Sequence, residues 1–159
     1  MRRIIRRREL VADDVRYAGE PLVAGTRAVQ PVGEFIAAGN ATAAGVAVLL
    51  SPTDEVETLA PHLHRLQLIV VEFPKIGEGR GYSQARLLRQ RFGYRGELRA
   101  RGALKRDQLF FLARCGFDSF DLDAGEDLEA ALGGLDAFSV AYQDASDGLL
   151  HVQQRASPD

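Results

Sequence analysis

Residues 67–73 read QLIVVEF, an almost unbroken run of apolar side chains. Such a run is typical of a strand that is covered on both faces, as in parallel sheets. A second run of the same kind, GVAVLL, lies at 45–50. Between them, SPTDEVETLAPHLHRL offers Ser51 or Thr53 as the cap of a helix with acidic residues in its first turn. The two runs therefore predict parallel strands joined by a helix.

The same alternation continues beyond residue 73. YSQARLLRQRF at 82–92 has apolar residues at helical spacing, and we expect Arg86 and Arg89 on the solvent face of this helix. The further expected elements are a strand at 96–102, a helix at 105–116 closed by Gly116, a strand at 117–122, a helix at 125–135 and a strand at 138–143.

This order of elements predicts a single α/β domain with about five mostly parallel strands that alternate with helices. An open doubly wound sheet and a partial (β/α) barrel-like arrangement both agree with the strand spacing. We assign the α/β core to 45–143, an irregular N-terminal segment packed on it to 1–44, and a tail to 144–159. Within the first segment, RRIIRRREL fits an exposed edge strand whose arginines discourage edge pairing, and PVGEFIAAG at 31–39 fits a short helix.

The composition is that of a soluble globular protein, with 46% hydrophobic and 26% charged residues among 159. No apolar run approaches the roughly 20 residues that span a bilayer, and the basic N-terminus lacks the apolar segment of a signal peptide. We therefore expect a cytoplasmic protein without a membrane partner. Cys115 is the single cysteine, which excludes an internal disulfide or an iron–sulfur cluster held by this chain alone, and we expect it to be buried. No carboxylate joins the histidines at ligand spacing, so no metal site is expected.

Positive charge is concentrated between residues 75 and 106. This segment holds ten Lys and Arg residues against two acids, Glu78 and Glu97, so its net charge is +8. Because the whole chain has a net charge of −2, the remainder carries −10. A separation of this size creates a local field that attracts an anion or an acidic partner. The alternative is that the arginines surround a solvated helix and pair with the acidic remainder.

Ligands of parallel α/β folds bind at the carboxyl ends of the strands. The strand at 67–73 is followed by PKIGEGRGYS, where glycines allow close backbone approach, a helix start offers N–H groups, and an arginine adds a guanidinium. The candidates for binding an oxyanion or a carboxylate are Lys75, Arg80, Gly81, Tyr82 and Ser83. A capped surface loop without a ligand is the alternative, since the loop is not of the GxxxxGK[ST] type and no GxGxxG follows the first strand.

The strand at 96–102 is followed by GALKRDQLFF, where Arg106, Asp107 and Gln108 begin the next helix. Arg106 is a candidate second anion contact and Asp107 its orienting acid, although Asp107 also suits the helix dipole by itself. Glu72 lies beside the basic loop, either as an acid or base or as the partner of a nearby cation. The chain has no Trp, and the basic residues near the strand at 96–102 are not interleaved with aromatic residues, so single-stranded nucleic acid is not a favoured partner.

Seven short motifs lie in order along the chain: FPK at 73–75, GRGYS at 79–83, ARLLR at 85–89, GELRA at 96–100, RDQL at 106–109, RCGFD at 114–118 and FSVAYQ at 138–143. In these motifs the chain resembles a bacterial family, domain of unknown function 934. Members of that family are commonly encoded beside the haem-containing assimilatory sulfite reductase and labelled as oxidoreductases. The family tends to be apolar where this chain has Arg101, so Arg101 is not expected in a shared site.

The resemblance implies an accessory protein of assimilatory sulfite reduction, which binds the reductase or its electron donor, or handles the sulfite anion. It carries over, without assigned roles, Lys75, Arg80, Tyr82, Ser83, Arg99, Arg106, Asp107 and Gln108. No flavin or nicotinamide fingerprint is present, so no cofactor is expected, while an atypical flavin site stays open. Two other functions stay open, a small enzyme acting on a phosphorylated or carboxylated metabolite and a non-catalytic docking module, as does a homo-oligomer.

Overall fold

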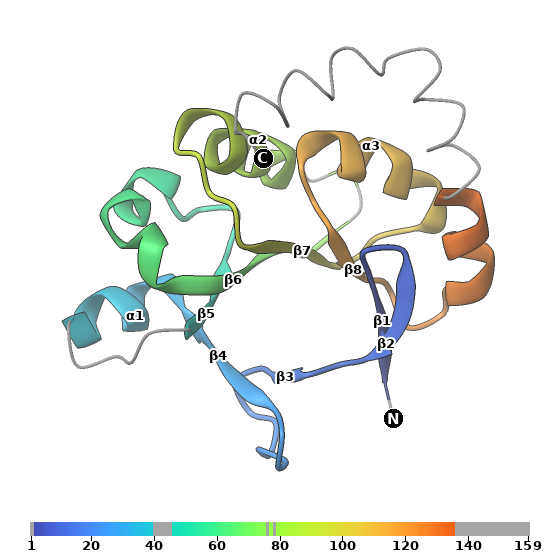
Figure 1. Cartoon of the computed structure of the whole chain (residues 1–159), viewed down its shortest axis with the longest axis horizontal. Coiled ribbons are helices and arrows are strands. Elements are labelled where there is room, and N and C mark those ends of the chain that lie inside the picture. Colours follow the sequence, from blue (N-terminus) through green and yellow to red (C-terminus); the bar gives the residue numbers. More distant parts are fainter. Residues whose placement is uncertain (1, 40–45, 76, 78, 136–159) are drawn as a thin grey trace.

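One curled sheet of eight strands is the frame of the protein (Figure 1). The structure is a computed structural model that describes residues 2–39, 46–75, 77 and 79–135. The strand order is β2-β1-β8-β7-β6-β5-β4-β3; neighbours from β3 to β8 run parallel, and β1 is antiparallel to both β2 and β8. The strands are β1 (Arg3–Arg6), β2 (Glu9–Ala12), β3 (Val15–Arg16), β4 (Arg27–Pro31), β5 (Val46–Leu50), β6 (Leu66–Phe73), β7 (Glu97–Gly102) and β8 (Ser119–Asp121).

The helices labelled in Figure 1 lie on the outer, convex side of the curl. A doubly wound sheet is covered by helices on both faces, whereas a (β/α) barrel carries them only outside. The barrel-like alternative is therefore the one found. The helical segments are α1 (Val32–Ala38), the 3-10 turns η2 (Val56–Thr58), η3 (Ala60–Arg65) and η5 (Arg106–Gln108), α2 (Arg80–Arg86) with its π-helical continuation η4 (Leu87–Arg91), α3 (Leu109–Cys115), and helical residues at 128–135.

The four expected strands within the described part of the core are confirmed as β5 to β8. The expected total of about five was wrong, because β1 to β4 come from residues 1–44, which we expected to be irregular. RRIIRRREL is not an exposed edge strand, since β1 lies between β2 and β8 with Ile4 and Ile5 fully buried. The expected strand at 138–143 and the tail at 144–159 lie outside the described residues.

The expected helices differ in how well they form. α1 begins directly after Pro31, and the left-handed Gly116 (φ 116°) ends α3, both as predicted. The segment after β5 forms only the short turns η2 and η3. Its start is held by Asp54, whose carboxylate accepts a hydrogen bond from the backbone N–H of Ser51 at 2.8 Å. Asp54 is thus the acceptor there, in place of a Ser51 or Thr53 cap.

Arg89 does not lie on the solvent face that the helical spacing predicts for it. It is half-buried, and it donates hydrogen bonds to the carbonyl oxygens of Gly116, Tyr94 and Gly96 at 2.9, 2.9 and 2.8 Å. The π-helical turn η4 changes the direction in which side chains leave the helix, which a 3.6-residue period does not anticipate. Arg86, one turn earlier, is exposed as expected.

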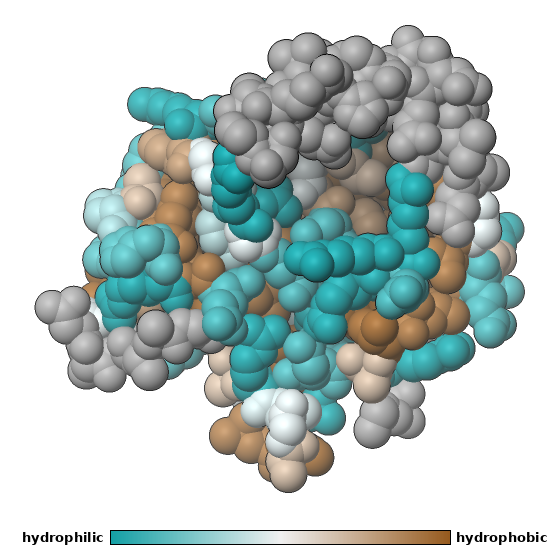
Figure 2. All heavy atoms as spheres, viewed as in Figure 1, coloured by the Kyte–Doolittle hydropathy of each residue, from teal (hydrophilic) through white to brown (hydrophobic). Residues whose placement is uncertain are grey.

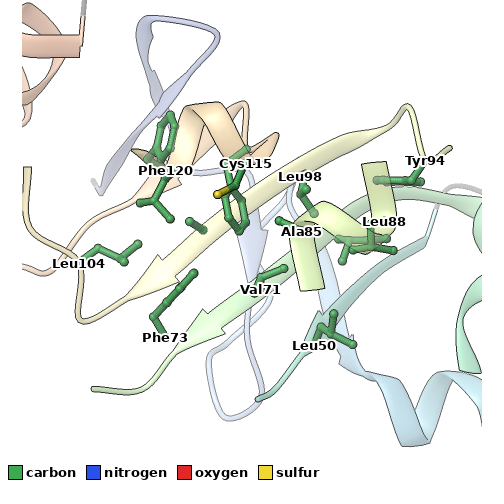
Figure 3. Close-up of a cluster of buried hydrophobic side chains, with 14 of the residues drawn as sticks. Leu50, Val71, Phe73, Ala85, Leu88, Tyr94, Leu98, Leu104, Cys115 and Phe120 are labelled. Carbon is green, nitrogen blue, oxygen red and sulfur yellow. The ribbon is translucent and has the colours of Figure 1, made fainter. Parts of the chain in front are cut away.

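Alternation along the strands divides the sheet into two faces. The outer face packs against α2 and α3 and forms the main core, in which Cys115 is buried (Figure 3). Each fully buried aliphatic side chain in such a layer stabilises the fold by about 1.5–3 kcal/mol. The residues labelled in Figure 3 are Leu50, Val71, Phe73, Ala85, Leu88, Tyr94, Leu98, Leu104, Cys115 and Phe120.

The opposite face of the sheet lines the inside of the curl. On β7 it is charged, because Glu97, Arg99 and Arg101 alternate with the buried Leu98 and Ala100. Figure 2 shows hydrophilic side chains gathered in the middle of the view, inside the arc of strands. The remainder of this face, on and beside β3 to β6, is a second apolar cluster that consists of Val15, Tyr17, Val29, Ala47, Leu68 and Val70.

Arg99 is the centre of the charged half and is fully buried. Its Nη2 lies 2.7 Å from Glu97 Oε2 and 3.2 Å from Asp14 Oδ1, its Nε 3.2 Å from Ser119 Oγ, and its Nη1 3.4 Å from Asp13 Oδ1. Asp13 and Asp14 form the link between β2 and β3, the two edge strands of the sheet. One side chain in the middle of the sheet therefore holds the segment that connects its edges.

Three more arginines hold the same link. Arg2 Nη2 lies 2.6 Å from Asp13 Oδ2, Arg6 Nη2 lies 2.8 Å from Asp14 Oδ1, and Arg27 Nη2 lies 3.1 Å from Asp14 Oδ2. Burial of Asp14 opposes its ionisation, but the charges of Arg99, Arg6 and Arg27 outweigh burial and hold the pKa of Asp14 below its ordinary value. The charges around the link therefore favour the ionised form of Asp14.

Arg99→Met is expected to destabilise the protein by about 3–5 kcal/mol, because it leaves the carboxylates around it buried without their central cation. Urea unfolding followed by circular dichroism should show a lower midpoint at an unchanged slope. The matched control is Arg95→Met, an exposed site in the same basic segment, where we expect a change of about 0.5 kcal/mol or less. Equal losses at the two positions would contradict a central role for Arg99.

Candidate functional site

The carboxyl ends of β5, β6 and β7 form one rim, and side-chain amides tie its loops together. Gln84 of α2 donates from Nε2 to the carbonyl oxygens of Ser51 and Asp54, in the loop after β5, at 2.9 and 3.1 Å. Gln108 of η5 donates from Nε2 to Tyr82 Oη at 3.0 Å, which joins the loop after β7 to α2. The rim is therefore a connected surface and not a set of separate loops.

The structure brings Tyr82 and Gln108 of the sequence candidates into direct contact. The amide of Gln108 has a second bond, since its Oε1 accepts from the backbone N–H of Lys105 at 2.8 Å. Gly81 is buried against the ring of Phe73, where an added Cβ would overlap ring atoms. These three candidates thus form a packed centre. The other rim candidates are exposed around it, namely Lys75, Arg80, Ser83, Arg106 and Asp107.

Arg99, the remaining candidate, lies apart from this rim. Its side chain is on the inner face of β7, and each nitrogen of its guanidinium has a partner within the protein. The network around the link between β2 and β3 accounts for Arg99 without a ligand.

A second group of polar residues lies on the inner face, at the carboxyl ends of β6, β7 and β8. Glu72, Arg101 and Asp121 are paired neighbours across these three strands. Arg101 Nη1 lies 3.4 Å from Glu72 Oε2, and Arg101 Nε lies 3.7 Å from Asp121 Oδ2. The guanidinium carbon of Arg101 also lies 3.7 Å from the centre of the Tyr17 ring, a cation–π distance. We call Tyr17, Glu72, Arg101 and Asp121 the inner-rim cluster.

Two atoms of the inner-rim cluster, Tyr17 Oη and Asp121 Oδ2, are buried without a hydrogen-bond partner in the described part of the chain. Burial raises the pKa of Asp121; Arg2 opposes this, Asp13 adds to it, and Arg101 also opposes it. Burial likewise raises the pKa of Tyr17, so its hydroxyl remains a proton donor. Asp121 Oδ2 has ion pairs with Arg2 Nη2 at 3.4 Å and Arg101 Nε at 3.7 Å, but neither is a hydrogen bond. Buried polar atoms without a hydrogen bond are uncommon in folded proteins, and water or a ligand often completes their hydrogen bonds.

Sequence reasoning names Glu72 as an acid or base and misses the rest of the cluster. Tyr17 lies in the segment expected to be irregular, and Arg101 is placed outside any shared site by the family pattern. The sequence nevertheless contained a signal for this cluster. The expected strands at 67–73, 96–102 and 117–122 each have a charged residue in the last position but one, namely Glu72, Arg101 and Asp121. Equivalent positions of neighbouring parallel strands lie side by side, so these charged residues are predicted to form a row across the sheet.

The outer side of the rim carries exposed aromatic and basic groups. Phe111 of α3 has 44% of its surface exposed, although it is large and apolar. The Tyr82 ring lies 5.0 Å from it between centroids, and the Arg86 guanidinium carbon lies 5.8 Å from its centroid. Arg114 follows Phe111 by three residues on the same helix and is exposed. We call Tyr82, Arg86, Phe111 and Arg114 the α2–α3 face.

Within the described ranges, no group of three or more His, Cys, Asp or Glu side chains is placed to hold a metal ion. None of the helices in that part of the chain is both long and apolar enough to cross a membrane.

Gly81→Ala is expected to lower the free energy of unfolding by about 1–3 kcal/mol, because the new Cβ overlaps the buried ring of Phe73. Higher helix propensity offsets at most about 1 kcal/mol of this loss. Gly79→Ala is the matched control, since no atom lies within 4 Å of its added Cβ. Chemical unfolding of both variants tests the difference, and equal stabilities would show that Gly81 is not required by packing.

Asp121→Asn tests the raised pKa of Asp121. In the folded wild type, ionisation of this carboxyl is disfavoured, so the stability that it contributes is present at low pH and is lost as pH rises through its folded pKa. The amide does not titrate, so the unfolding free energy of the variant, relative to wild type, should rise between about pH 4 and about pH 8. A constant difference over this range, measured by urea unfolding, would contradict the raised pKa.

The sequence comparisons agree with the motifs on the rim. Neither the curated proteins nor the solved structures contain a match to this chain. A family model described as a bacterial protein of unknown function (DUF934) matches residues 47–151, which covers β5 to β8, α2, α3 and both candidate loops. The chain therefore belongs to the DUF934 family of bacterial proteins.

Proposed function

We propose that this protein is an accessory protein of assimilatory sulfite reduction, which docks on the sulfite reductase or on its electron donor through the α2–α3 face. The pathway rests on the resemblance to a family encoded beside the reductase. The mode of action rests on one observation, an exposed aromatic side chain flanked by arginines on packed helices.

The residue types of the α2–α3 face favour protein binding. Aromatic and arginine side chains supply much of the binding energy in protein interfaces, whereas most surface residues contribute little. Phe111 is held between Tyr82 and Arg86, so its exposed ring is already ordered before a partner arrives. Because the face is basic, the partner it fits carries an acidic surface.

An anion grip by the GRGYS loop alone has less support from the geometry. The backbone N–H of Tyr82 donates to Gly79 O at 3.2 Å, and the hydroxyl of Tyr82 accepts from Gln108. Gly81 faces the Phe73 ring. Several groups that the sequence offers to an anion are therefore engaged within the protein. On the α2–α3 face, in contrast, Arg86 and Phe111 are exposed to solvent.

Deletion of the gene, followed by growth on single sulfur sources, tests the pathway. We expect growth on sulfide or cysteine and failure on sulfate and sulfite, because the defect lies at the reduction of sulfite. Normal growth of the deletion strain on sulfate would overturn the proposal.

Complementation of the same strain tests the docking face. Arg86→Glu with Phe111→Ala should fail to restore growth on sulfate, because charge reversal and truncation each cost about 1–3 kcal/mol at an interface. Arg95→Glu reverses an exposed charge elsewhere in the basic segment and should complement fully. Binding of the purified reductase, measured at low and high salt, should be lost in the double variant and weakened by salt in the wild type.

A further inference from the structure

Arg99 and Arg101 of β7 lie on the same face of the sheet, but their guanidinium groups differ in how many of their nitrogen atoms have partners within the protein. Arg99 is fully buried, and its shortest contact, 2.7 Å to Glu97, is that of a strong charge-assisted hydrogen bond. Arg101 has 25% of its side chain exposed, and its two acidic contacts are 3.4 and 3.7 Å long. Among the described residues its Nη2 has no hydrogen-bond or ion-pair partner. The guanidinium of Arg101 therefore keeps donors for another acceptor.

The surroundings of Arg101 resemble a binding site more than a surface ion pair. The guanidinium carbon of Arg101 lies 3.7 Å from the centre of the Tyr17 ring, and this cation–π contact helps to hold the cation in place. Among the described residues the buried Tyr17 hydroxyl has no hydrogen-bond partner, and the charges of Asp121, Arg99 and Arg101 act on it. Glu72 and Arg101 are partly exposed, whereas Tyr17 and Asp121 are buried. The cluster is therefore accessible to solvent from the side of Glu72 and Arg101.

Charge balance determines what the cluster can accept. Within the described residues, the ion pairs inside the curl link five arginines and five carboxylates into one network. Its members are Arg2, Arg6, Arg27, Arg99, Arg101, Asp13, Asp14, Glu72, Glu97 and Asp121. An anion on Arg101 adds a negative charge to this balanced network, close to Asp121. Protonation of Asp121 by solvent restores the balance and removes the competing acceptor of Arg101.

We propose that the inner-rim cluster is a binding site for a small oxyanion, in which Arg101 is the cation, Tyr17 is the hydrogen-bond donor, and Asp121 takes up a proton from solvent as the anion binds. This site is separate from the α2–α3 face and does not depend on the docking function proposed above. Its position at the carboxyl ends of parallel strands is where α/β folds bind ligands.

The proton uptake follows from the groups around Asp121. The bound anion weakens the attraction between Arg101 and Asp121, and it brings a second negative charge near the Asp121 carboxylate. Both effects favour the protonated form of Asp121. The titratable and charged groups that face Asp121 come from the N-terminus, the link between β2 and β3, the end of β3, and β7, and they are Arg2, Asp13, Tyr17, Arg99 and Arg101. In the range where one proton is taken up, affinity falls by about tenfold for each unit that the pH rises.

Isothermal titration calorimetry of the full chain tests the site. Sodium sulfate and sodium acetate are the two probes, each compared with sodium chloride at equal ionic strength, which distinguishes an inorganic oxyanion from a carboxylate. Titrations between about pH 5 and about pH 8, in buffers of different ionisation enthalpy, count the protons. We expect one probe to bind with uptake of about one proton and tighter binding at the lower pH.

Three variants identify the residues. Tyr17→Phe should weaken binding by about 10- to 100-fold, the loss expected for one hydrogen bond to a charged group. It should leave the unfolding midpoint unchanged or higher, since the deleted hydroxyl has no hydrogen-bond partner in the part of the chain that the structure describes. Arg101→Met should abolish binding. Asp121→Asn should bind without proton uptake and with an affinity that does not change with pH.

Arg95→Ala is the control, because Arg95 is exposed in the basic segment and is not one of the candidate binding residues. Lys75→Ala tests the basic loop, and it should leave the affinity unchanged when the anion binds at the inner-rim cluster. The proposal fails if neither probe binds at millimolar concentration, or if binding survives Arg101→Met or Tyr17→Phe. Loss of binding in Lys75→Ala would move the site to the basic loop instead. Binding of the wild type without proton uptake would also overturn it.

Discussion

The ion pairs between Arg99 and the consecutive aspartates Asp13 and Asp14 are the constraint on which the curled sheet depends. Arg99 comes from the middle of the strand order, and the two aspartates connect the edge strands β2 and β3. An open sheet would leave both edges unpaired, whereas here one short link passes from one edge to the other across the inside of the curl. The link is too short to have a core of its own, so the arginines around it take the place of packing.

Such a network does not raise stability by itself, because the desolvation of ten charged groups offsets much of their attraction. Its stronger effect is to specify geometry, since a slip of β1 or β4 by one residue would turn Arg6 or Arg27 away from Asp14. The driving force for folding comes from the opposite face, where apolar side chains of β5 to β8 pack against α2 and α3. The outer face therefore supplies stability, and the inner face fixes how the sheet curls.

This division explains how much of the fold could be predicted from the sequence. β5 to β8, α2 and α3 follow from local periodicity, because apolar runs mark the strands and apolar residues at helical spacing mark the helices that cover them. The segment after β5 is the exception, since it forms only short 3-10 turns. The N-terminal strands do not, since RRIIRR holds four arginines and only two buried residues, Ile4 and Ile5, and has no apolar period. The burial of Arg6 is explained by its ion pairs with Asp14 and Glu97, and Glu97 lies 91 residues away in the sequence. On the rim, the contact between Tyr82 and Gln108 could be expected, because both follow the carboxyl ends of neighbouring parallel strands. The contact of Tyr17 with Arg101 could not, because it depends on how the sheet curls.

The end of β6 connects the two surfaces of the rim. Glu72 and Phe73 are consecutive, so their side chains leave the strand on opposite faces. Glu72 points inward to Arg101, while the Phe73 ring packs outside on Tyr82, at 5.3 Å between centroids, and covers Gly81. The backbone oxygen of Phe73 also accepts a hydrogen bond from Ala103 N at 2.8 Å, which fixes β6 to the loop after β7. The alternation of side chains along β6 thus places an ionisable inner group and an aromatic outer group one residue apart, and neither can shift without moving the strand that carries both.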